Sequence, residues 1–292
     1  MHGLLGWVAI AACGKAPHVE PTVGANTDPL ACNGHRTLCD RPYDQVSFPG
    51  AHNASASEAD GFLRGVNANQ AVDVATLLDH GVRVLLLDVY ASDDGSRVLC
   101  HGPCELGSVP HLDVLDDLAA FLDAHPRELV TLVYQDAVPA QDIEADLETA
   151  TLASRAYAHD PTTPWPTLGT LLDGGHQLLV TLESGQPPPD TLHHVWDLAW
   201  DTPYTWTLDT GFDCSLNRGD PSHPILLVNH WLSTDVGLPA ADEASHANAY
   251  ASLWAHADGC RQDPGAHPTW VVVDYADTGD LMQVVADLNG VP

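Results

Sequence analysis

Short apolar runs rich in Val, Leu and Ile recur along the chain, and the segments between them place apolar residues at helical spacing. Because the runs are apolar on both faces, they fit strands of a parallel sheet that is covered on both sides. We expect seven strands, at Gln45–Phe48, Val82–Tyr90, Leu129–Tyr134, Gln177–Leu182, Leu198–Trp200, Ile225–His230 and Trp270–Tyr275.

Helical patterns separate these strands. The clearest is His111–Ala124, in which apolar residues at 112, 115, 118, 119 and 122 share one face. Pro166 suits the first turn of another helix, and Gly174 suits its end. The predicted helices are Ala71–His80, His111–Ala124, Ile143–Tyr157, Thr167–Leu172, Ala241–Ala257 and Asp280–Leu288.

The alternation of strands and helices predicts an α/β fold with a parallel sheet and right-handed crossovers. The chain has 292 residues, which suits one large domain of this kind. No Gly-rich phosphate loop follows any predicted strand, so an open nucleotide-binding sheet has little support. We therefore predict an irregular (β/α) TIM-type barrel.

The N-terminus resembles an export signal. The apolar run Leu4–Ala12 ends in small residues directly before Cys13, as in a bacterial lipoprotein signal whose cysteine carries the lipid; an ordinary cleaved signal peptide is the alternative. We expect residues 1–13 to be this signal, residues 14–30 a linker rich in Pro, Ala, Thr and Gly, and residues 31–292 the barrel. The protein should then be exported to the cell envelope or extracellular space, with an N-terminal lipid anchor at the membrane.

Six cysteines remain after Cys13, and an even number in an exported protein indicates disulfide bonds. Short spacings favour Cys32–Cys39 and Cys100–Cys104, which leaves Cys214–Cys260. A zinc site at Cys100, His101 and Cys104 is a weaker alternative, because no second cysteine pair at zinc-site spacing completes four ligands.

The charge of the chain narrows its partners. Ten Lys and Arg stand against 40 Asp and Glu, for a formal net charge of -30. A surface this acidic repels nucleic acid and anionic lipid faces, so we expect no nucleic-acid partner. The acidity favours solubility, with screening by divalent cations as the alternative, and we expect a monomer.

Polar residues follow the predicted strands at their carboxyl ends, where active sites of such barrels lie. His52 and Asn53 follow the first strand, and His101 lies in an excursion after the second. Two histidines suit acid–base chemistry, because one can accept a proton while the other donates one. The chain has 17 histidines, so a surface location is the alternative for each of them. Asp274 could orient one of the pair.

Several segments together resemble one family. They are CNGHRTLCDRPYDQVSFPGAHNAS, GVRVLLLDVY, VLCHGPC, HPRELVTLVYQD, WPTLG, LLVNHWLS and WVVVDYADTGDLMQVVADLNG. Their order and spacing, from Cys32 to Val291, resemble phosphatidylinositol-specific phospholipases C with an X-domain-type barrel, above all secreted or anchored fungal and plant members. The resemblance implies His52 as general base on the inositol 2-hydroxyl, His101 as general acid, Asp274 as partner of His52, and an inositol cyclic phosphate as product.

The resemblance is incomplete where the phosphate charge must be neutralised. The resemblance to calcium-dependent members implies a calcium site at Asn53, Asp88 and Gln135. Leu86 stands where these members have an acid, so the site would be weak unless the side chain of Asp136 turned toward the ion. The metal-independent bacterial members have an arginine at the Asp88 position. Candidate substrate-binding residues are two arginines and one aromatic residue that could stack on the headgroup: Arg64, Arg218 and Tyr275.

We therefore expect a phosphoric diester hydrolase acting on phosphatidylinositol or a related glycerophospholipid, with calcium as its candidate cofactor. One alternative is a catalytically weakened module that binds headgroups, as Leu86 and Gln135 suggest. Another is a phosphodiesterase for a sphingolipid or a glycerophosphodiester.

Overall fold

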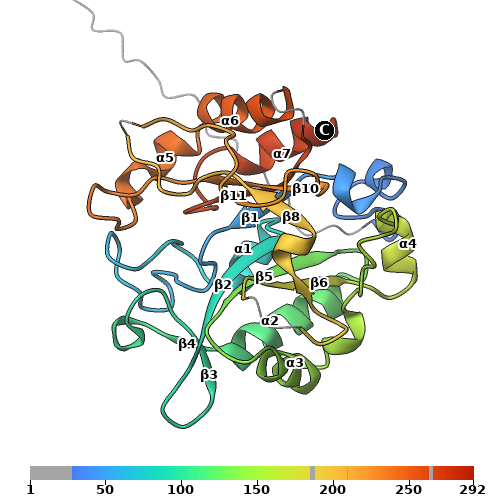
Figure 1. Cartoon of the computed structure of the whole chain (residues 1–292), viewed down its shortest axis with the longest axis horizontal. Coiled ribbons are helices and arrows are strands. Elements are labelled where there is room, and N and C mark those ends of the chain that lie inside the picture. The colour runs from blue at the N-terminus through green and yellow to red at the C-terminus, as the bar shows by residue number, and fades with distance from the viewer. Residues whose placement is uncertain (1–27, 185–187, 209, 263–265) are drawn as a thin grey trace, which may run out of the picture.

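The computed structural model describes residues 28–292, except 185–187, 209 and 263–265. Its centre is a curled sheet in which nine strands follow the order β7-β6-β5-β2-β1-β11-β10-β8-β9 (Figure 1). The predicted α/β class and TIM-type barrel are confirmed. The strands are β1 Phe48–Ala51, β2 Val84–Ala91, β3 Arg97–Leu99, β4 Val109–Pro110, β5 Val130–Asp136, β6 Leu178–Leu182, β7 His193–His194, β8 Ala199–Asp201, β9 Arg218–Gly219, β10 Ile225–His230 and β11 Pro268–Val273.

The sheet is parallel from β7 through β8, and the irregularity lies at its edges. Within the described residues, antiparallel pairing occurs where β3 joins β2 and β4, and where β9 joins β8. The end strands β7 and β9 form no ladder with each other in the part of the chain that the structure describes. The barrel is therefore open along one side.

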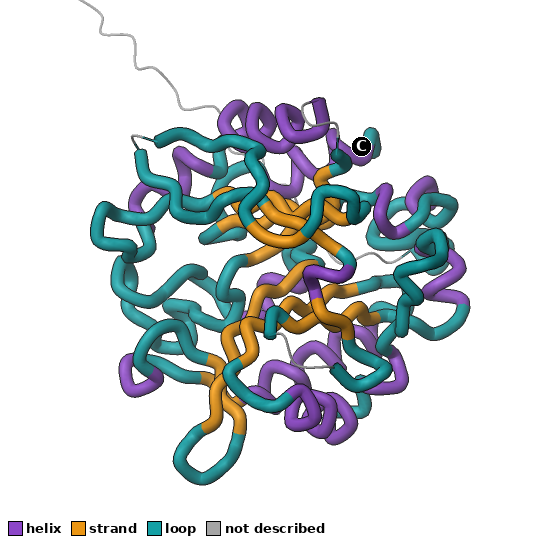
Figure 2. Tube along the Cα trace, in the orientation of Figure 1, coloured by secondary structure: helices purple, strands orange, loops and turns teal. Residues whose placement is uncertain are grey.

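Helices surround the strands, as the purple and orange segments of Figure 2 show. The prediction of His111–Ala124 is confirmed residue for residue as α2, because Val114, Leu115 and Leu118 bury its apolar face. The helices are α1 Val74–Asp79, α2 His111–Ala124, α3 Ala140–Thr149, α4 Leu168–Asp173, α5 Ala244–Ala247, α6 Tyr250–Gln262 and α7 Leu281–Asn289.

The strands are buried on both faces, which explains their continuous apolar runs. In β2, Leu85 and Leu87 join the cluster that packs against the helices, whereas Val84 and Leu86 join the cluster inside the barrel. Successive side chains of a strand point to opposite faces, so one run supplies both layers.

The first predicted strand, Gln45–Phe48, was wrong. Tyr43–Gln45 form a 3-10 turn, and β1 begins only at Phe48. β1 pairs with both β11 and β2, so its backbone must approach its neighbours closely. Gly50 permits this, because a Cβ at that position would lie 2.6 Å from Val272.

Two predicted helices were too long. The helix predicted at Ile143–Tyr157 ends at Thr149, and Thr151 then adopts a φ of 61°, which a helix cannot continue through. The helix predicted at Ala241–Ala257 is broken at Asn248, whose carbonyl accepts from Asp280 N. The Asp280 carboxylate accepts from Tyr250 N at 2.7 Å and so caps a new helix, α6.

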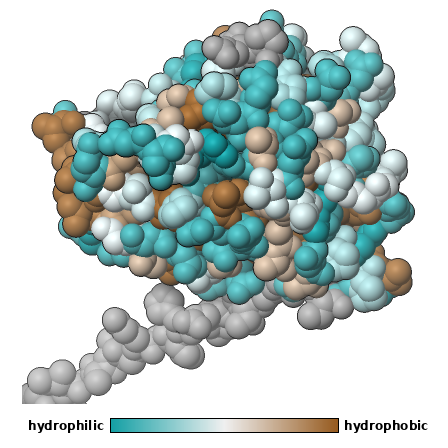
Figure 3. All heavy atoms as spheres, turned by 90° about the horizontal axis from the view of Figure 1, so that it is seen from below, coloured by the Kyte–Doolittle hydropathy of each residue, from teal (hydrophilic) through white to brown (hydrophobic). Residues whose placement is uncertain are grey.

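The three predicted disulfides, Cys32–Cys39, Cys100–Cys104 and Cys214–Cys260, are present, and the second of them excludes the zinc alternative at His101. The predicted signal segment and residues 14–27 of the predicted linker lie outside the described residues. Among the described helices, none has the length and apolar character to cross a bilayer. Seen from below, the surface is mostly hydrophilic with separate hydrophobic patches (Figure 3).

A buried ion-pair network ties the β3 hairpin to the helices. The Asp146 carboxylate accepts from Arg97 Nε at 2.8 Å and pairs with His111 Nδ1 at 2.8 Å. Burial raises the pKa of Asp146, but Arg97 and His111 more than offset this and hold it at about 2. The folded state therefore keeps a stabilising charge on Asp146 at neutral pH.

We expect Asp146→Asn to lower the free energy of unfolding by about 3 kcal/mol at pH 7, because the buried His111 and the partly buried Arg97 lose the carboxylate that both of them contact. Since the folded pKa of Asp146 is depressed, its contribution is complete above its ordinary value and disappears as the pH falls through about 2. Denaturant unfolding at pH 7 and at pH 2 measures this. An equal loss at both pH values would contradict the assignment.

Candidate active site

The candidate active site lies at the carboxyl ends of the central strands. His52 follows β1 directly, and Asp274 follows β11 directly. Because β1 and β11 are parallel neighbours, with Ala51 opposite Val273, the two side chains meet at one edge of the sheet. The strand-end rule thus places these residues as the sequence analysis expected.

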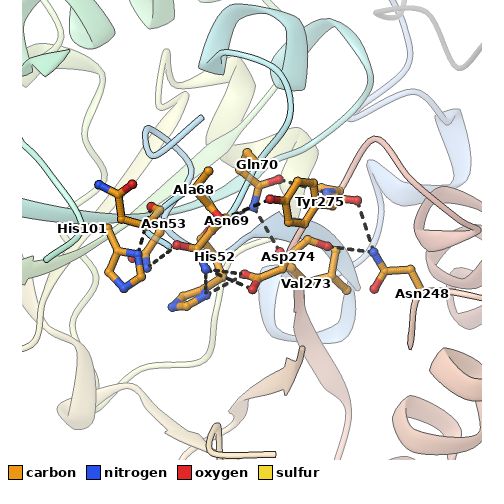
Figure 4. A network of polar contacts seen from close by, with 12 residues as sticks. His52, Asn53, Ala68, Asn69, Gln70, His101, Asn248, Val273, Asp274 and Tyr275 are labelled. Atoms are coloured by element: carbon orange, nitrogen blue, oxygen red, sulfur yellow. Dashed lines mark hydrogen bonds and ion pairs between the residues drawn. The ribbon is translucent and has the colours of Figure 1, made fainter. Parts of the chain in front are cut away.

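His52 and Asp274 form a close pair. His52 Nδ1 lies 2.8 Å from Asp274 Oδ1, and the Asp274 side chain is buried (Figure 4). Since a carboxylate only accepts, Nδ1 carries the proton and Nε2 keeps a lone pair. The His52 ring stacks on Trp231, with ring centroids 3.9 Å apart. His52 is therefore held in the tautomer that can act as a base at Nε2.

His101 faces His52 from the other side. Their ring centroids are 6.4 Å apart, a spacing at which two imidazoles can flank one small group. His101 Nδ1 lies 3.2 Å from the carbonyl oxygen of Asn67, which accepts, so this nitrogen also carries a proton. Burial, and then the neighbouring His52, lower the pKa of His101, which makes its charged form a stronger acid.

The backbone next to both members of the His52–Asp274 pair is unusual. Asn53 has a φ of 43° and Tyr275 a φ of 50°, and each directly follows one member of the pair. Residues other than glycine rarely adopt this left-handed conformation, and such residues concentrate at functional sites.

A narrow hollow of about 90 Å³ lies on the barrel side of His52. Polar side chains line most of it: Asn53, Asp88, Gln135, Glu183, Arg218 and Asn229. A wider hollow of about 400 Å³ borders both His52 and His101, and Thr205, Thr207, Ser233 and Thr234 are among the residues that line it. The histidine pair therefore stands between two spaces of different size.

Arg218 reaches the narrow hollow, but two carboxylates hold it. Its Nη1 donates to Glu183 at 2.8 Å and its Nη2 to Asp201 at 2.6 Å. Burial lowers the pKa of Arg218, while Glu183 and Asp201 raise it, and the net change is upward. One guanidinium between two carboxylates leaves no excess positive charge for a phosphate.

The structure does not bring Arg64 and Tyr275 to either hollow. Arg64 donates to Glu58 at 2.8 Å and to Asp242 at 3.2 Å, and it covers the Tyr275 ring. Tyr275 is buried, and its hydroxyl donates to Ala68 O at 3.2 Å. Both residues therefore stabilise the loops around the site instead of facing the substrate.

Whether the oxygen or the nitrogen of the Asn53 amide faces Asp88 decides whether a cation can fit beside the Asp88 carboxylate. Asn69 Nδ2 donates to both oxygens of Asp274, at 3.1 and 3.0 Å, so Asn69 Oδ1 must accept from Asn53 Nδ2, at 3.1 Å. The Asn53 oxygen then faces the two Asp88 oxygens, at 3.1 and 3.3 Å. Turning this amide round would give Asp88 a donor, but would set the oxygens of Asn53 and Asn69 against each other.

Oxygens that face one another need a cation or a proton between them. Burial raises the pKa of Asp88 to about 6, and His52 lowers it only in part. Gln135 and Glu183 line the same hollow, whereas Asp136 accepts from Ser184 N and does not line it. This set of oxygen donors, with two carboxylates, fits a calcium ion.

Sequence reasoning missed Glu183 and Asn69 at this site, and it did not foresee the contact between Trp231 and His52. Glu183 directly follows β6, so the strand-end rule could have identified it. Trp231 directly follows β10, but nothing in the sequence indicates that it stacks on His52. Asn69 lies in a loop without periodicity, and its contact with Asp274 depends on the folded chain.

Comparison with known proteins identifies the class. The family model described as PI-PLC X 1 matches residues 38–289. A PI-PLC X domain-containing protein 1 of Arthroderma benhamiae is 32% identical, over 89% of this chain and 90% of that protein. A PI-PLC X domain-containing protein of Arabidopsis thaliana is 26% identical, over 95% and 70%. Another relative from Arthroderma benhamiae, named an uncharacterized secreted protein, is 27% identical, over 93% and 66%.

Solved structures agree on the fold. The phosphatidylinositol-specific phospholipase C of Staphylococcus aureus has a TM-score of 0.58 at 15% identity, over 86% of this chain and 95% of that one. The enzyme of Listeria monocytogenes has a TM-score of 0.53 at 13% identity, also over 86% and 95%. The fold is therefore a barrel of the phospholipase C type. The chain belongs to the PI-PLC X family.

Proposed function

We propose that this protein is a phosphoric diester hydrolase that uses His52 as general base and His101 as general acid. The observation that carries the proposal is the pair of imidazole rings, whose centroids are 6.4 Å apart. The ring of His52 is hydrogen-bonded to the buried carboxylate of Asp274. Each ring is held through Nδ1, so Nε2 is the nitrogen that we assign to proton transfer on both rings; on His52 the Asn53 amide lies 3.3 Å from this atom.

The reaction would proceed by internal attack. His52 Nε2 takes the proton from a hydroxyl group next to the phosphate, and this oxygen forms a bond to phosphorus. The bond from phosphorus to the leaving alcohol breaks, and His101 Nε2 gives that oxygen a proton. The product is a cyclic phosphate, which water opens with the two roles reversed. Phosphatidylinositol, whose headgroup carries a hydroxyl group next to the phosphate, is the substrate that we propose.

The two hollows suit the two ends of such a substrate. The narrow hollow borders His52 but not His101, so it would take the headgroup that carries the attacking hydroxyl. The wider hollow borders His101, so it would take the leaving alcohol. Tyr204 lines both hollows and lies where it could contact either end.

Negative charge develops on the phosphate during attack and must be stabilised. Because Arg218 is neutralised by Glu183 and Asp201, we propose that a calcium ion supplies this charge. Asn53, Asp88 and Gln135 would hold it, with Glu183 as a further ligand from the same hollow. When bound, calcium would neutralise phosphate oxygens as a Lewis acid.

We expect calcium to raise turnover at least tenfold over protein treated with a chelator, and to raise the Tm of the wild-type protein. Both responses should disappear in Asp88→Ala, because that substitution removes the buried carboxylate. A calcium titration of activity and of thermal unfolding, on both proteins, measures this. Full turnover in the presence of chelator would contradict the calcium proposal and leave the histidine pair untouched.

We further propose that the protein is exported and lipid-anchored at Cys13, so that it meets its substrate at a membrane. The apolar run before this cysteine and the three disulfides support export. The secreted relative is consistent with it. Mass spectrometry of the purified mature protein tests the anchor, since an unmodified Cys13 would contradict it.

A second candidate function is headgroup binding without turnover. The observation that favours it is the set of residues around the proposed calcium site. Gln135 supplies an amide where an acid is expected, and Leu86 supplies no ligand at another such position, so the site has few negative charges. Incubation with phosphatidylinositol vesicles separates the two functions. Release of water-soluble phosphate by the wild-type protein, but not by His52→Ala/His101→Ala, supports the hydrolase. Binding of vesicles without release supports the binding module.

A further inference from the structure

The segment of four residues Asn67–Gln70 reaches both members of the histidine pair. Figure 4 labels Ala68, Asn69 and Gln70 of this segment beside His52 and Asp274. The carbonyl oxygen of Asn67 accepts from His101 Nδ1 at 3.2 Å. Asn69 Nδ2 donates to Asp274, the partner of His52. Gln70 Nε2 donates to the carbonyl oxygen of His52 at 2.7 Å. One short segment of the loop between β1 and α1 thus reaches both sides of the site.

We propose that Asn67–Gln70 is a positioning segment that sets the tautomer of both histidines at once, and that Asn69 is its decisive side chain. This proposal rests on the proposed function, because it assigns a role relative to His52 and His101. It extends that function by naming residues that act through the histidine pair and do not touch the reacting atoms.

Asn69 acts by restricting Asp274. A carboxylate that is free to rotate can turn its lone pairs away from an imidazole and release it. Here Asn69 Nδ2 bonds to both carboxylate oxygens, at 3.1 and 3.0 Å, and so fixes the plane of the carboxylate. Oδ1 of Asp274 therefore remains directed at Nδ1 of His52. This contact keeps the proton on Nδ1 and the lone pair on Nε2 of His52.

Asn67 acts through its backbone. A carbonyl oxygen can only accept, so His101 must present a protonated Nδ1 to it. The proton that His101 can give away is then the one on Nε2. The same segment therefore decides, on both rings, which nitrogen takes part in proton transfer.

The segment is itself firmly held. Tyr275 N donates to Asn69 O at 2.7 Å, and Asn69 N donates to Ala56 O at 2.9 Å. Asn69 is 1% exposed and Gln70 is fully buried, so water does not compete for these bonds. Tyr275, which adopts a φ of 50° directly after Asp274, closes the network on that side. The geometry of both histidines thus depends on bonds within one buried network.

The test compares Asn69→Ala with a matched control. Asn289 is also a buried asparagine with two backbone bonds: it donates to Ser47 O at 2.8 Å and accepts from Ser47 N at 2.9 Å. It ends α7, and its partner Ser47 precedes β1, at the opposite end of that strand from His52. We expect Asn69→Ala to lower kcat about 100-fold with KM nearly unchanged, because the base is misoriented and not removed. Asn289→Ala should lower stability and leave kcat within about twofold of the wild-type value.

A spectroscopic measurement on the free protein separates positioning from a general loss of structure. The proton between His52 Nδ1 and Asp274 should give a downfield imidazole N–H signal in proton NMR, which His52→Ala abolishes. We expect Asn69→Ala to weaken or remove this signal, Asn289→Ala to keep it, and Asn69→Ser, which retains a donor, to restore part of it. An unchanged signal and unchanged kcat in Asn69→Ala would overturn the proposal. Because the signal needs no turnover, it decides the role of Asn69 even if the hydrolase function fails.

Discussion

His52→Ala is expected to lower kcat at least about 1,000-fold on every phosphodiester that the protein hydrolyses. The substitution removes the base that takes the proton from the attacking hydroxyl, and general acid–base catalysis of this kind contributes about 10²–10⁴. The loss should not depend on the leaving group, because His52 acts on the nucleophile. Steady-state kinetics with an alcohol and with a nitrophenol as leaving group measures this.

A control for His52→Ala must be a histidine outside the network. His246 is exposed on α5 and lines neither hollow, so His246→Ala should keep full activity. Thermal unfolding of both variants would show that each is folded. Retention of wild-type kcat by a folded His52→Ala would exclude His52 as the base.

His101→Ala is expected to show the opposite selectivity. With an alcohol as leaving group, its kcat should fall about 1,000-fold, because the departing oxygen is no longer protonated. With a nitrophenol, whose anion leaves without a proton, the loss should shrink to about tenfold. The lowered pKa of His101, caused by burial and then by His52, suits a group that gives up its proton.

The contrast between the two variants is the informative quantity for His101. If His101→Ala loses equal activity on both substrates, His101 does not act on the leaving group. If His52→Ala and His101→Ala exchange their selectivities, the two roles are reversed. Either result would contradict the assignment, although both histidines would remain part of the site.

Much of the fold was predictable from the sequence because strong apolar patterns dictate it. Ile225–His230 was predicted and observed as β10 with the same bounds, since six consecutive residues are buried. β1 was misplaced because Phe48–Ala51 contains Pro49 and Gly50, which do not favour strands on their own. That strand exists because its two neighbours in the sheet supply its hydrogen bonds.

The candidate site was predictable only in part. The strand-end rule and the family resemblance indicated His52, His101 and Asp274, and the structure brings them together. The choice between Arg64 and Arg218 could not be made from the sequence, because it depends on which loop each arginine packs against.

The residues that orient the catalytic groups were not predictable in the same way. Asn69 contacts Asp274 across 205 positions of the chain, and no local pattern encodes such a contact. Its importance follows from hydrogen-bond accounting: a buried amide must place its donor on Asp274, and every other orientation in the network follows from that.

The most direct test of the central claim is the identity of the first phosphate product. Phosphorus NMR of phosphatidylinositol vesicles incubated with the wild-type protein should show a five-membered cyclic inositol phosphate that forms first and is then slowly opened by water. Neither His52→Ala nor His101→Ala should produce it at a comparable rate. An acyclic inositol phosphate as the first product, with no cyclic phosphate at early times, would contradict internal attack with His52 as the base.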